Sequence, residues 1–225
     1  MRTNEQINKL FDFDNSKNAL IIGTDEAGRG PAAGGVFASA VFFNNLNDEL
    51  INELAILNDS KKLSKKRREE LFDIIKENTI NSTICIEVEE IEEINILNAS
   101  LKAMKLACDE VAQQIISNAT TDDKNILTLV DGNKLIKNYS YAQEFVIKGD
   151  GKSASIAAAS ILAKVSRDRY MLELDSKFPQ YGWEQNAGYL TAKHIEAIDK
   201  YGLCEHHRAS FLKKHFAKQE QLSLF

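Results

Sequence analysis

The chain has 225 residues, 44% of them hydrophobic, which is enough to bury the core of one large domain. Its formal net charge of -5, from 28 Lys and Arg against 33 Asp and Glu, excludes a protein that holds nucleic acid by bulk positive charge alone. The three cysteines, Cys85, Cys108 and Cys204, form no CxxC pair, which argues against a disulfide framework and a thiolate zinc site. We expect a cytoplasmic protein without a membrane partner, because we find no signal peptide and no apolar run long enough to cross a bilayer.

Strands and helices alternate along the predicted chain. The pattern predicts the order strand, strand, helix, strand, helix, strand, strand, helix, over residues 18–25, 34–43, 64–78, 82–90, 94–117, 125–132, 144–150 and 153–178. A glycine-rich turn joins the first two strands, so we expect them to be antiparallel, and Ser64 is the expected N-cap of the first helix. The last helix is rich in Ala and Ser, so it must pack closely against another element. This order predicts an α/β domain with a mixed sheet and a mainly helical C-terminal part.

Carboxylates follow three of the predicted strands. Asp25 with Glu26, Asp131 and Asp150 each lie at or just beyond a strand's carboxyl end, where α/β sheets bind ligands. A single acid in such a place is more often a turn former or a helix cap, but three strand ends that carry acids indicate a shared site. Clustered like charges need a counter-ion, and carboxylates without His or Cys at ligand spacing favour Mg²⁺ or Mn²⁺ over zinc.

The turn "TDEAGRGPAAGG" at 24–35 places glycines beside two of these carboxylates. A nucleotide-binding loop is the rival interpretation, but the turn lacks the GK[ST] ending and the GxGxxG spacing, and a strand follows where a helix is required. Glycines let backbone amides approach a ligand closely, and Arg29 offers planar donors to an anion or locks the loop. A metal cluster beside such a loop suits a phosphodiester.

Six motifs as a set resemble ribonuclease HII: "DEAGRGP", "DSKKLS", "VDGN", "KGDGKSASIAAASILAKVSRDR", "YGWEQNAGYLTAKH" and "EHHRASF". The resemblance covers residues 21 to 211, approximately. It implies a ribonuclease H-like mixed β-sheet flanked by helices, with a C-terminal helical region that helps to form a nucleic-acid groove. It also implies an enzyme that hydrolyses the RNA strand of RNA/DNA hybrids and nicks duplex DNA at embedded ribonucleotides.

Carried over by position, the resemblance makes Asp25, Glu26 and Asp131 the core metal ligands and Asp150 the fourth. Some family members take the last ligand from a Glu in the following helix, and the matching place here holds Ser155.

Asp168 is the other candidate for the fourth ligand. We favour for it a salt bridge with Arg167 or Arg169, or a supporting position behind the site.

The expected chemistry is in-line displacement at a phosphate bridged by two Mn²⁺ or Mg²⁺ ions, leaving 5'-phosphate and 3'-hydroxyl ends on the 5' side of the ribonucleotide. The 2'-hydroxyl is not the nucleophile, so it can serve for recognition. By resemblance, the backbone of Gly28, Arg29 and Gly30 reads this hydroxyl and Tyr189 packs on the sugar at the junction. Lys61 and Lys62, together with the "EHHRASF" segment, are expected to contact the nucleic-acid backbone.

Two other classes of function stay open. One is a non-catalytic nucleic-acid binding module with the same fold, and the other is a metal-dependent phosphohydrolase of a small phosphate ester. The histidines, His194 among them, are undecided between structural and catalytic roles.

We expect a monomer with four parts: an N-terminal extension over 1–18, a ribonuclease H-like catalytic domain over 19–178, a helical substrate-binding region over 179–217 and a flexible tail over 218–225. The tail ends in "QEQLSLF". Its Gln221, Leu222, Leu224 and Phe225 resemble the short peptide by which bacterial replication and repair proteins dock on the DNA sliding clamp. The alternatives are a frayed terminus and a Phe225 that folds back onto the core.

Overall fold

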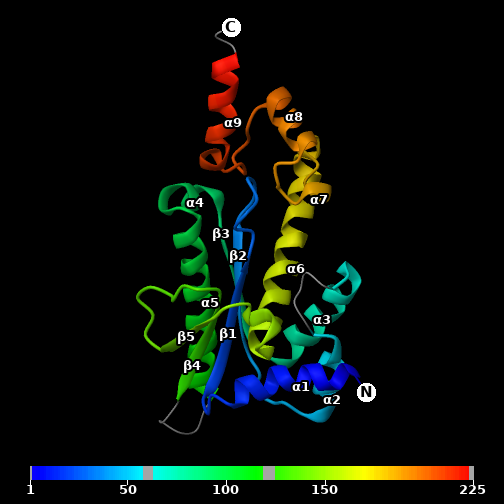
Figure 1. Ribbon diagram of the computed structural model, residues 1–225, viewed down its shortest axis with the longest axis vertical. Helices are drawn as coiled ribbons and strands as arrows, with labels where there is room; N and C mark the ends of the chain where they lie inside the picture. The colour runs from blue at the N-terminus through cyan, green and yellow to red at the C-terminus, as the bar shows by residue number, and fades with distance from the viewer. Residues whose placement is uncertain (1, 58–62, 119–124, 223–225) are drawn as a thin grey trace.

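The structure is a computed structural model that describes residues 2–57, 63–118 and 125–222. In this part of the chain, a five-stranded sheet in the order β3-β2-β1-β4-β5 forms the centre of the molecule (Figure 1). The strands are β1 (Leu20–Ala27), β2 (Val36–Phe42), β3 (Ile80–Ile86), β4 (Ile126–Asp131) and β5 (Ala142–Val146). β2 is antiparallel to β1 and β3, whereas β4 is parallel to β1 and β5. The mixed sheet and the antiparallel first pair are therefore confirmed.

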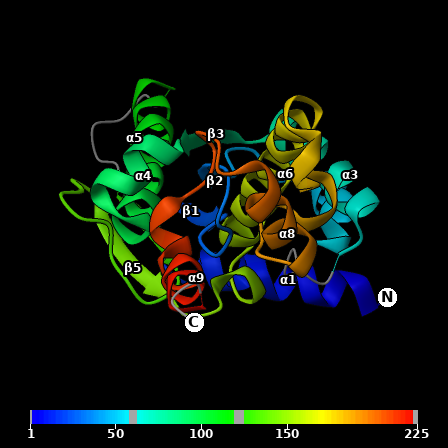
Figure 2. The same cartoon turned by 90° about the horizontal axis from the view of Figure 1, so that it is seen from above.

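Helices cover both faces of this sheet (Figures 1 and 2). On one face lie α4 (Val88–Ile94) and α5 (Ile96–Asn118), and on the other lie α1 (Arg2–Asn15), α3 (Lys65–Asn78) and α6 (Ala154–Lys177). The remaining helices and 3-10 turns are α2 (Asp48–Glu53), η1 (Leu54–Ile56), η3 (Gly149–Gly151), η4 (Pro179–Tyr181), α7 (Trp183–Asn186), α8 (Ala192–Tyr201) and α9 (Ala209–Leu222). No helix of the described residues is both long and apolar enough to span a bilayer.

Three predicted boundaries are wrong for local reasons. The strand expected over 82–90 ends at Ile86, because the following residues form α4, which buries Val88 and Ile91 on one face. The long helix expected over 94–117 starts only at Ile96, since Asn95 adopts a positive φ of 67° and accepts hydrogen bonds from the first amides of α5. The last strand, expected over 144–150, is observed as β5 over Ala142–Val146, and residues 149–151 form η3. The predicted Ser64 cap is confirmed by its bond from the Arg67 amide.

The Ala- and Ser-rich start of α6 packs directly on β1, as its composition predicts. A Cβ added at Gly23 of β1 would lie 2.2 Å from the Ser155 carbonyl carbon and 2.3 Å from the Ile156 nitrogen. Only glycine fits there, so the strand and the helix approach as closely as their backbones allow. This contact fixes the start of α6 beside the residues that follow Gly23 in β1.

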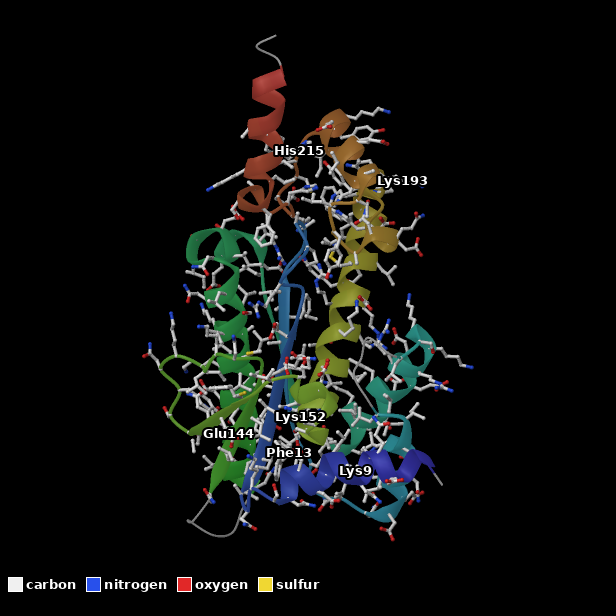
Figure 3. The ribbon with its side chains drawn as sticks, in the orientation of Figure 1. Lys9, Phe13, Glu144, Lys152, Lys193 and His215 are labelled. Carbon is white, nitrogen blue, oxygen red and sulfur yellow. The ribbon has the colours of Figure 1, made fainter. Side chains whose placement is uncertain are left out.

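The N-terminal helix α1 is part of the same packed unit. Its Ile7, Leu10 and Phe11 are buried in the core formed with α2, α3 and α6. Behind α1, the Lys17 ammonium lies 2.8 Å from a Glu144 carboxylate oxygen of β5 and 5.0 Å from the centre of the Phe13 ring. Figure 3 shows Phe13 and Glu144 near one another at this end of the sheet.

The C-terminal helices pack on the end of α6 and on the glycine-rich turn after β1. Their core contains Met171 and Leu174 of α6, Trp183 of α7, and Ala32 and Ala33 of the turn. This shared core places the C-terminal region above the strand ends that carry the predicted metal ligands (Figure 1).

Candidate active site

Three of the four predicted metal ligands surround one cavity. β1 and β4 are parallel neighbours, and their register pairs Thr24 with Val130, so the next residues, Asp25 and Asp131, lie side by side. Glu26 follows directly on β1. The cavity has a volume of about 340 Å³ and is lined by Asp25, Glu26, Ala27, Gly28, Asp131, Ser160, Lys164, Arg167 and Tyr189.

The carboxylates are crowded and partly desolvated. Burial raises the pKa of Asp25 well above its usual value, and the charges of Glu26 and Asp131 raise it further. Burial also raises the pKa of Glu26, although Arg29, with its Nη1 3.1 Å from Glu26 Oε1, opposes this rise. Carboxylates in such surroundings repel one another, and a divalent cation would relieve the repulsion.

The oxygen donors that line the cavity fit a divalent cation that also keeps water or substrate as ligands. The cavity lining contains carboxylates and a hydroxyl, with no His or Cys, and such oxygen donors favour Mg²⁺ or Mn²⁺. Within the described residues, no three His, Cys, Asp or Glu side chains are placed so that together they could hold a metal ion. Instead, Glu26 pairs with Arg29, and Asp131 Oδ1 accepts a hydrogen bond from the Gly149 amide at 2.7 Å. An open set of this kind suits Mg²⁺, which retains waters and binds substrate phosphates beside one or two protein carboxylates.

Asp150 lies in the η3 turn and not at the end of β5, where the sequence places it. The turn is tied to the site by the hydrogen bond from Gly149 to Asp131. A Cβ at Gly149 would lie 3.1 Å from Asp131 Oδ1, so the η3 backbone passes close to the carboxylate. Among the described residues, however, those that line the cavity do not include Asp150. Its role as the fourth ligand stays a prediction.

Asp168 contacts Lys164, not Arg167 or Arg169 as predicted. Its Oδ1 lies 2.5 Å from Lys164 Nζ, one helical turn away on α6, and its Oδ2 lies 3.9 Å from Arg68 Nη2. Since Lys164 lines the cavity, Asp168 holds the Lys164 ammonium group in the cavity wall. This position favours the supporting role over that of a metal ligand.

Two buried arginines hold residues 28–35, which we call the glycine loop. The guanidinium groups of Arg167 and Arg208 and the amide of Arg208 all donate to main-chain carbonyls of this loop. A Cβ at Gly28, whose φ is +101°, would lie 2.3 Å from Arg167 Nε. The accepting carbonyls are those of Arg29, Pro31, Ala32, Ala33, Gly34 and Gly35.

Tyr189 lies against the glycine loop, and its predicted packing on the sugar stays a prediction. Its side chain is half-exposed, and a Cβ at Gly30 would lie 3.3 Å from the ring carbon Cε1. The backbones are joined as well, because the Ala32 amide donates to the Gly188 carbonyl at 2.9 Å. The aromatic ring and the loop therefore border the same cavity as the carboxylates.

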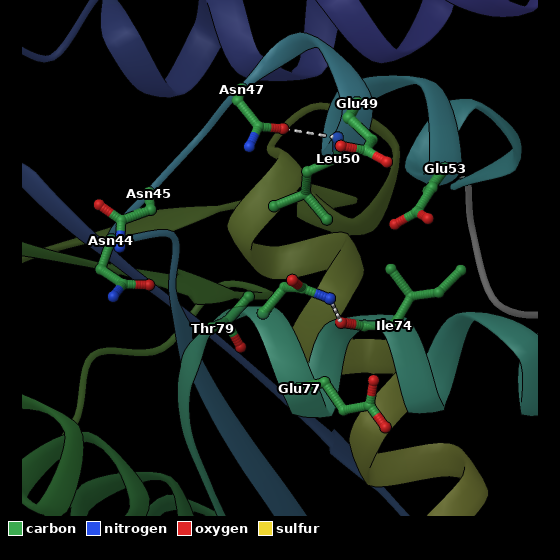
Figure 4. Close-up of a pocket in the computed structure, with 10 residues that line it drawn as sticks. Asn44, Asn45, Asn47, Glu49, Leu50, Glu53, Ile74, Glu77 and Thr79 are labelled. Atoms are coloured by element: carbon green, nitrogen blue, oxygen red, sulfur yellow. Dashed lines mark hydrogen bonds between the residues drawn. The ribbon is translucent and has the colours of Figure 1, made fainter.

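A second hollow, of about 540 Å³, lies between α2 and α3 (Figure 4). Its asparagines serve the helix ends, since Asn47 Oδ1 accepts the Leu50 amide at 2.8 Å and Asn78 Nδ2 donates to the Ile74 carbonyl at 2.9 Å. The ten described residues that line it include three glutamates and no Lys or Arg. This hollow is therefore unsuited to a phosphodiester, and the cavity at the strand ends is the candidate active site.

The model of the ribonuclease HII family matches residues 22–219 of the chain. The chain belongs to the ribonuclease HII family. It is 47% identical over 194 residues to the ribonuclease HII of Rickettsia africae, covering 86% of this chain and 92% of that protein. It is 45% identical over 213 residues to the ribonuclease HII of Fusobacterium nucleatum, covering 94% and 93%.

Solved structures of ribonucleases HII and HIII share the fold. The ribonuclease HII in a complex with PCNA from Archaeoglobus fulgidus superposes with a TM-score of 0.64 at 25% identity, over 84% of this chain and 93% of that one. Bst-RNase HIII in complex with Mn²⁺ gives a TM-score of 0.63 at 16% identity, over 82% and 63%. The predicted ribonuclease H-like α/β fold is thus confirmed. As a ribonuclease HII, the protein is a divalent-metal-dependent endoribonuclease that acts on the RNA of RNA/DNA hybrids.

Two of the four histidines of this ribonuclease HII, His194 and His207, are placed as structural groups. The Cys204 amide donates to His207 Nδ1 at 3.0 Å, which puts the His207 proton on Nε2, 3.2 Å from His194 Nε2. Trp183 Nε1 donates to the same His194 nitrogen at 3.1 Å, and His194 Nδ1 then donates to the Tyr189 carbonyl at 2.9 Å. Burial lowers the pKa of both imidazoles, that of His207 to about 4 with a contribution from His194, so both are neutral at pH 7.

Within the "EHHRASF" segment, two residues face the protein interior, so the predicted contact of this segment with the nucleic-acid backbone stays a prediction for its other residues. Arg208 and His207 are buried, and the Arg208 guanidinium binds the glycine loop. Lys61 and Lys62 lie outside the described residues, so their predicted contacts with the nucleic-acid backbone stay predictions.

The predicted C-terminal tail is described only in part. α9 continues to Leu222, so the backbone of Gln221 and Leu222 is helical, whereas a flexible tail was expected from residue 218. Leu224 and Phe225 lie outside the described residues.

Sequence reasoning missed three residues of α6 that line the cavity. Ser160, Lys164 and Arg167 follow one another at intervals of four and three, so they share one face of the helix. That spacing is visible in the sequence and could have identified them. Arg208 gave no such signal, because a basic segment on a helical C-terminal region normally indicates a solvated surface.

Proposed function

We propose that this ribonuclease HII nicks duplex DNA on the 5' side of a single embedded ribonucleotide, in addition to cutting RNA/DNA hybrids. The observation that carries the proposal is one cavity shared by the carboxylates, Gly28 of the glycine loop and Tyr189. Carboxylates alone would support metal-dependent hydrolysis of many phosphates. A close backbone loop with an aromatic ring beside them supports selection for a ribose 2'-hydroxyl.

Asp25, Glu26 and Asp131 would hold Mg²⁺ or Mn²⁺, two ions in the complex with substrate, and we retain Asp150 as the fourth ligand because η3 adjoins Asp131. Bound there, divalent cations supply activation of water and stabilisation of the leaving 3'-oxygen, which yields 5'-phosphate and 3'-hydroxyl ends.

The chain's own residues bind and orient the substrate. Arg29, which donates to Glu26 Oε1 in the metal-free site, would bind a phosphate of the substrate, which guanidinium groups recognise through paired donors. Lys164, fixed by Asp168, adds a positive charge to the cavity wall. Tyr189 and the glycine loop enclose the sugar, with the backbone of Gly28, Arg29 and Gly30 next to its 2'-hydroxyl. Lys61 and Lys62 are proposed to contact the flanking phosphates.

One assay separates this function from its alternatives. A labelled duplex with one ribonucleotide is incubated with the protein and Mg²⁺ or Mn²⁺, and the ends of the product strands are mapped. A nick on the 5' side with a 3'-hydroxyl end supports the proposal. Binding without a nick supports a non-catalytic module, and neither binding nor a nick supports a phosphohydrolase of small esters. Cleavage of a long hybrid without nicking at a single ribonucleotide would restrict the protein to the general activity of its family.

We further propose that the enzyme works as a monomer and meets newly made DNA through a sliding clamp. The Archaeoglobus fulgidus ribonuclease HII, which shares the fold, is described in a complex with PCNA. This finding supports a clamp as partner, and Gln221, Leu222, Leu224 and Phe225 supply the apolar and amide groups that a docking peptide needs. A protein with these partners would act in the cytoplasm of a bacterium.

A further inference from the structure

Arg208 is a fully buried cation whose hydrogen bonds go to a single segment. Its Nε and Nη2 donate to the Gly34 carbonyl at 2.9 and 2.6 Å, and its Nη1 donates to the Pro31 carbonyl at 2.9 Å. Longer bonds reach the carbonyls of Arg29 at 3.4 Å and Gly35 at 3.1 Å. All four acceptors are main-chain oxygens of the glycine loop.

No ion pair joins Arg208 to a carboxylate in the part of the chain that the structure describes. Burial lowers the pKa of Arg208 to about 10, with a smaller contribution from the charge of Arg167, so the side chain still carries its charge at neutral pH. The Phe211 ring, 5.3 Å from the Arg208 guanidinium carbon, is a further favourable contact, but a buried charge held mainly by carbonyl dipoles is an expensive way to stabilise a fold. The buried position of Arg208 therefore indicates a role other than stabilising the fold.

The loop held by Arg208 has Tyr189 on its far side. Gly30 lies against the Tyr189 ring, and the Ala32 amide bonds the Gly188 carbonyl. A Cβ at Gly188 would lie 2.6 Å from the Ala33 carbonyl oxygen, so the two segments cannot slide past one another. A displacement of the loop would thus displace Tyr189 as well.

We propose that Arg208 is a positioning residue for ribose recognition. Its hydrogen bonds fix the loop carbonyls toward the protein interior. They thereby set how far the loop and Tyr189 lie from the carboxylates, and this spacing admits a ribonucleotide and rejects a deoxyribonucleotide. Arg208 itself is absent from the residues that line the cavity, so it acts through the loop and not by contact with substrate. The inference rests on the proposed function, because it assigns the origin of the 2'-hydroxyl selectivity proposed there.

The test compares affinities for two duplexes that differ in one 2'-hydroxyl. Binding of an all-DNA duplex and of the same duplex with one ribonucleotide is measured with Ca²⁺, for the wild type, Arg208→Gln and Arg208→Lys. In Arg208→Gln we expect the preference for the ribonucleotide duplex to fall roughly tenfold, as when one or two hydrogen bonds are misplaced, with unchanged affinity for the all-DNA duplex. Arg208→Lys keeps the charge but lacks the planar fork, so it should restore only part of the preference.

The control is Leu71→Ala, which removes a buried side chain of α3 far from the loop. It lowers the melting temperature through a cavity, and it should leave the preference at the wild-type value. Equal loss of affinity for both duplexes in Arg208→Gln, an unchanged preference, or a failure of both variants at position 208 to fold would each overturn the proposal and make Arg208 an ordinary structural residue. If the wild type itself shows no preference, the proposed function fails, independently of Arg208.

Discussion

Asp25 is the most crowded side chain of the active site. It is 7% exposed, its Oδ1 accepts the Glu26 amide at 2.7 Å, and its neighbours on two strands are also acids. In the metal-free protein this crowding opposes folding, because burial and repulsion both disfavour the charged carboxylate. The same crowding favours the binding of a divalent cation, so the site trades stability for metal affinity.

We therefore expect Asp25→Asn and Asp131→Asn each to lower cleavage by roughly 10³-fold or more, because a lost carboxylate weakens and displaces the metal ions. The free energy of unfolding without metal should hold or rise as repulsion falls. Single-turnover cleavage and urea denaturation of the purified variants measure the two effects. Asp109→Asn, in an ion pair with Lys105 on α5, is the matched control and should cleave normally. Wild-type rates in either active-site variant would refute the assignment.

Tyr189 offers a second test, because its ring and not its hydroxyl lies closest to Gly30. Tyr189→Ala should slow cleavage at a single ribonucleotide roughly 10²-fold and reduce duplex affinity far less, since affinity depends mainly on phosphate contacts. Tyr189→Phe keeps the ring and should remain within a few-fold of the wild type. Parallel measurements of the dissociation constant and the single-turnover rate check this, and equal losses in both quantities would count against a positioning role.

At the scale of elements, β1 and α6 determine the geometry of the site. The sequence predicted both elements, and the run of small residues in α6 predicted close packing against an element that it did not identify. That this element is β1, at Gly23, is visible only in the structure. Sequence reasoning misplaced Asp150, because residues 149–151 form the η3 turn. The Gly149 amide of this turn donates to Asp131, which lies 18 positions earlier at the end of β4. Sequence reasoning also missed Ser160, Lys164 and Arg167: their spacing on one face of α6 is visible in the sequence, but only the fold shows that this face borders the carboxylates.

Gly23→Ala tests this packing. The added Cβ would meet backbone atoms of Ser155 and Ile156, which cannot move aside as a side chain can, so we expect a loss of roughly 2 kcal/mol in stability and reduced cleavage. Gly151→Ala is the control, because a Cβ at Gly151 has no neighbour within 4 Å among the described residues. Thermal denaturation of both variants decides the matter: equal stability of the two would contradict a backbone contact between β1 and α6.

The histidine pair under Tyr189 predicts a pH dependence. The folded protein protonates His207 only near pH 4, whereas the unfolded chain does so near 6.5, so stability is present above pH 6.5 and is lost as pH falls toward 4. The ring is surrounded by Tyr181, Trp183 and His194, and it cannot gain a proton without losing its bond from the Cys204 amide.

Between about pH 7 and about pH 5, His207→Asn should remove about 2 kcal/mol of the wild-type decrease in stability. Denaturation curves across this range, with His215→Asn on the exposed contact to Asp199 as control, provide the measurement. Parallel curves for the wild type and the position 207 variant would disprove the linkage.

At the scale of the whole molecule, the catalytic sheet and the C-terminal helices are not separable parts. Ala32 and Ala33 of the glycine loop belong to the same core as Trp183 and Leu212. The sequence indicated two regions because its motifs and helices fall into two blocks. It could not show that the turn between the first two strands is packed by the last block, since such contacts leave no periodic pattern.

Residues 221–225, which include the end of α9, are the part whose removal we expect to spare the active site. Deleting residues 221–225 should leave cleavage of a short duplex unchanged and abolish binding to the sliding clamp of the same organism, because a linear motif carries the affinity. A titration of the clamp with both forms measures this, and a variant with Leu224→Ser and Phe225→Ser controls for the shortened helix. Equal clamp affinity with and without the segment would refute the docking role.

The hydrogen bonds between Arg208 and Gly34 join residues 174 positions apart. During translation, the strand ends and their carboxylates leave the ribosome long before Arg208 is added, because synthesis proceeds from the N-terminus. A nascent chain can thus complete its sheet and helix α6, with Arg167 in place, while the glycine loop still lacks its second anchor, Arg208. If Arg208 sets the selectivity as proposed, a product that is truncated before residue 208 would carry the metal-binding carboxylates without the residue that positions the glycine loop.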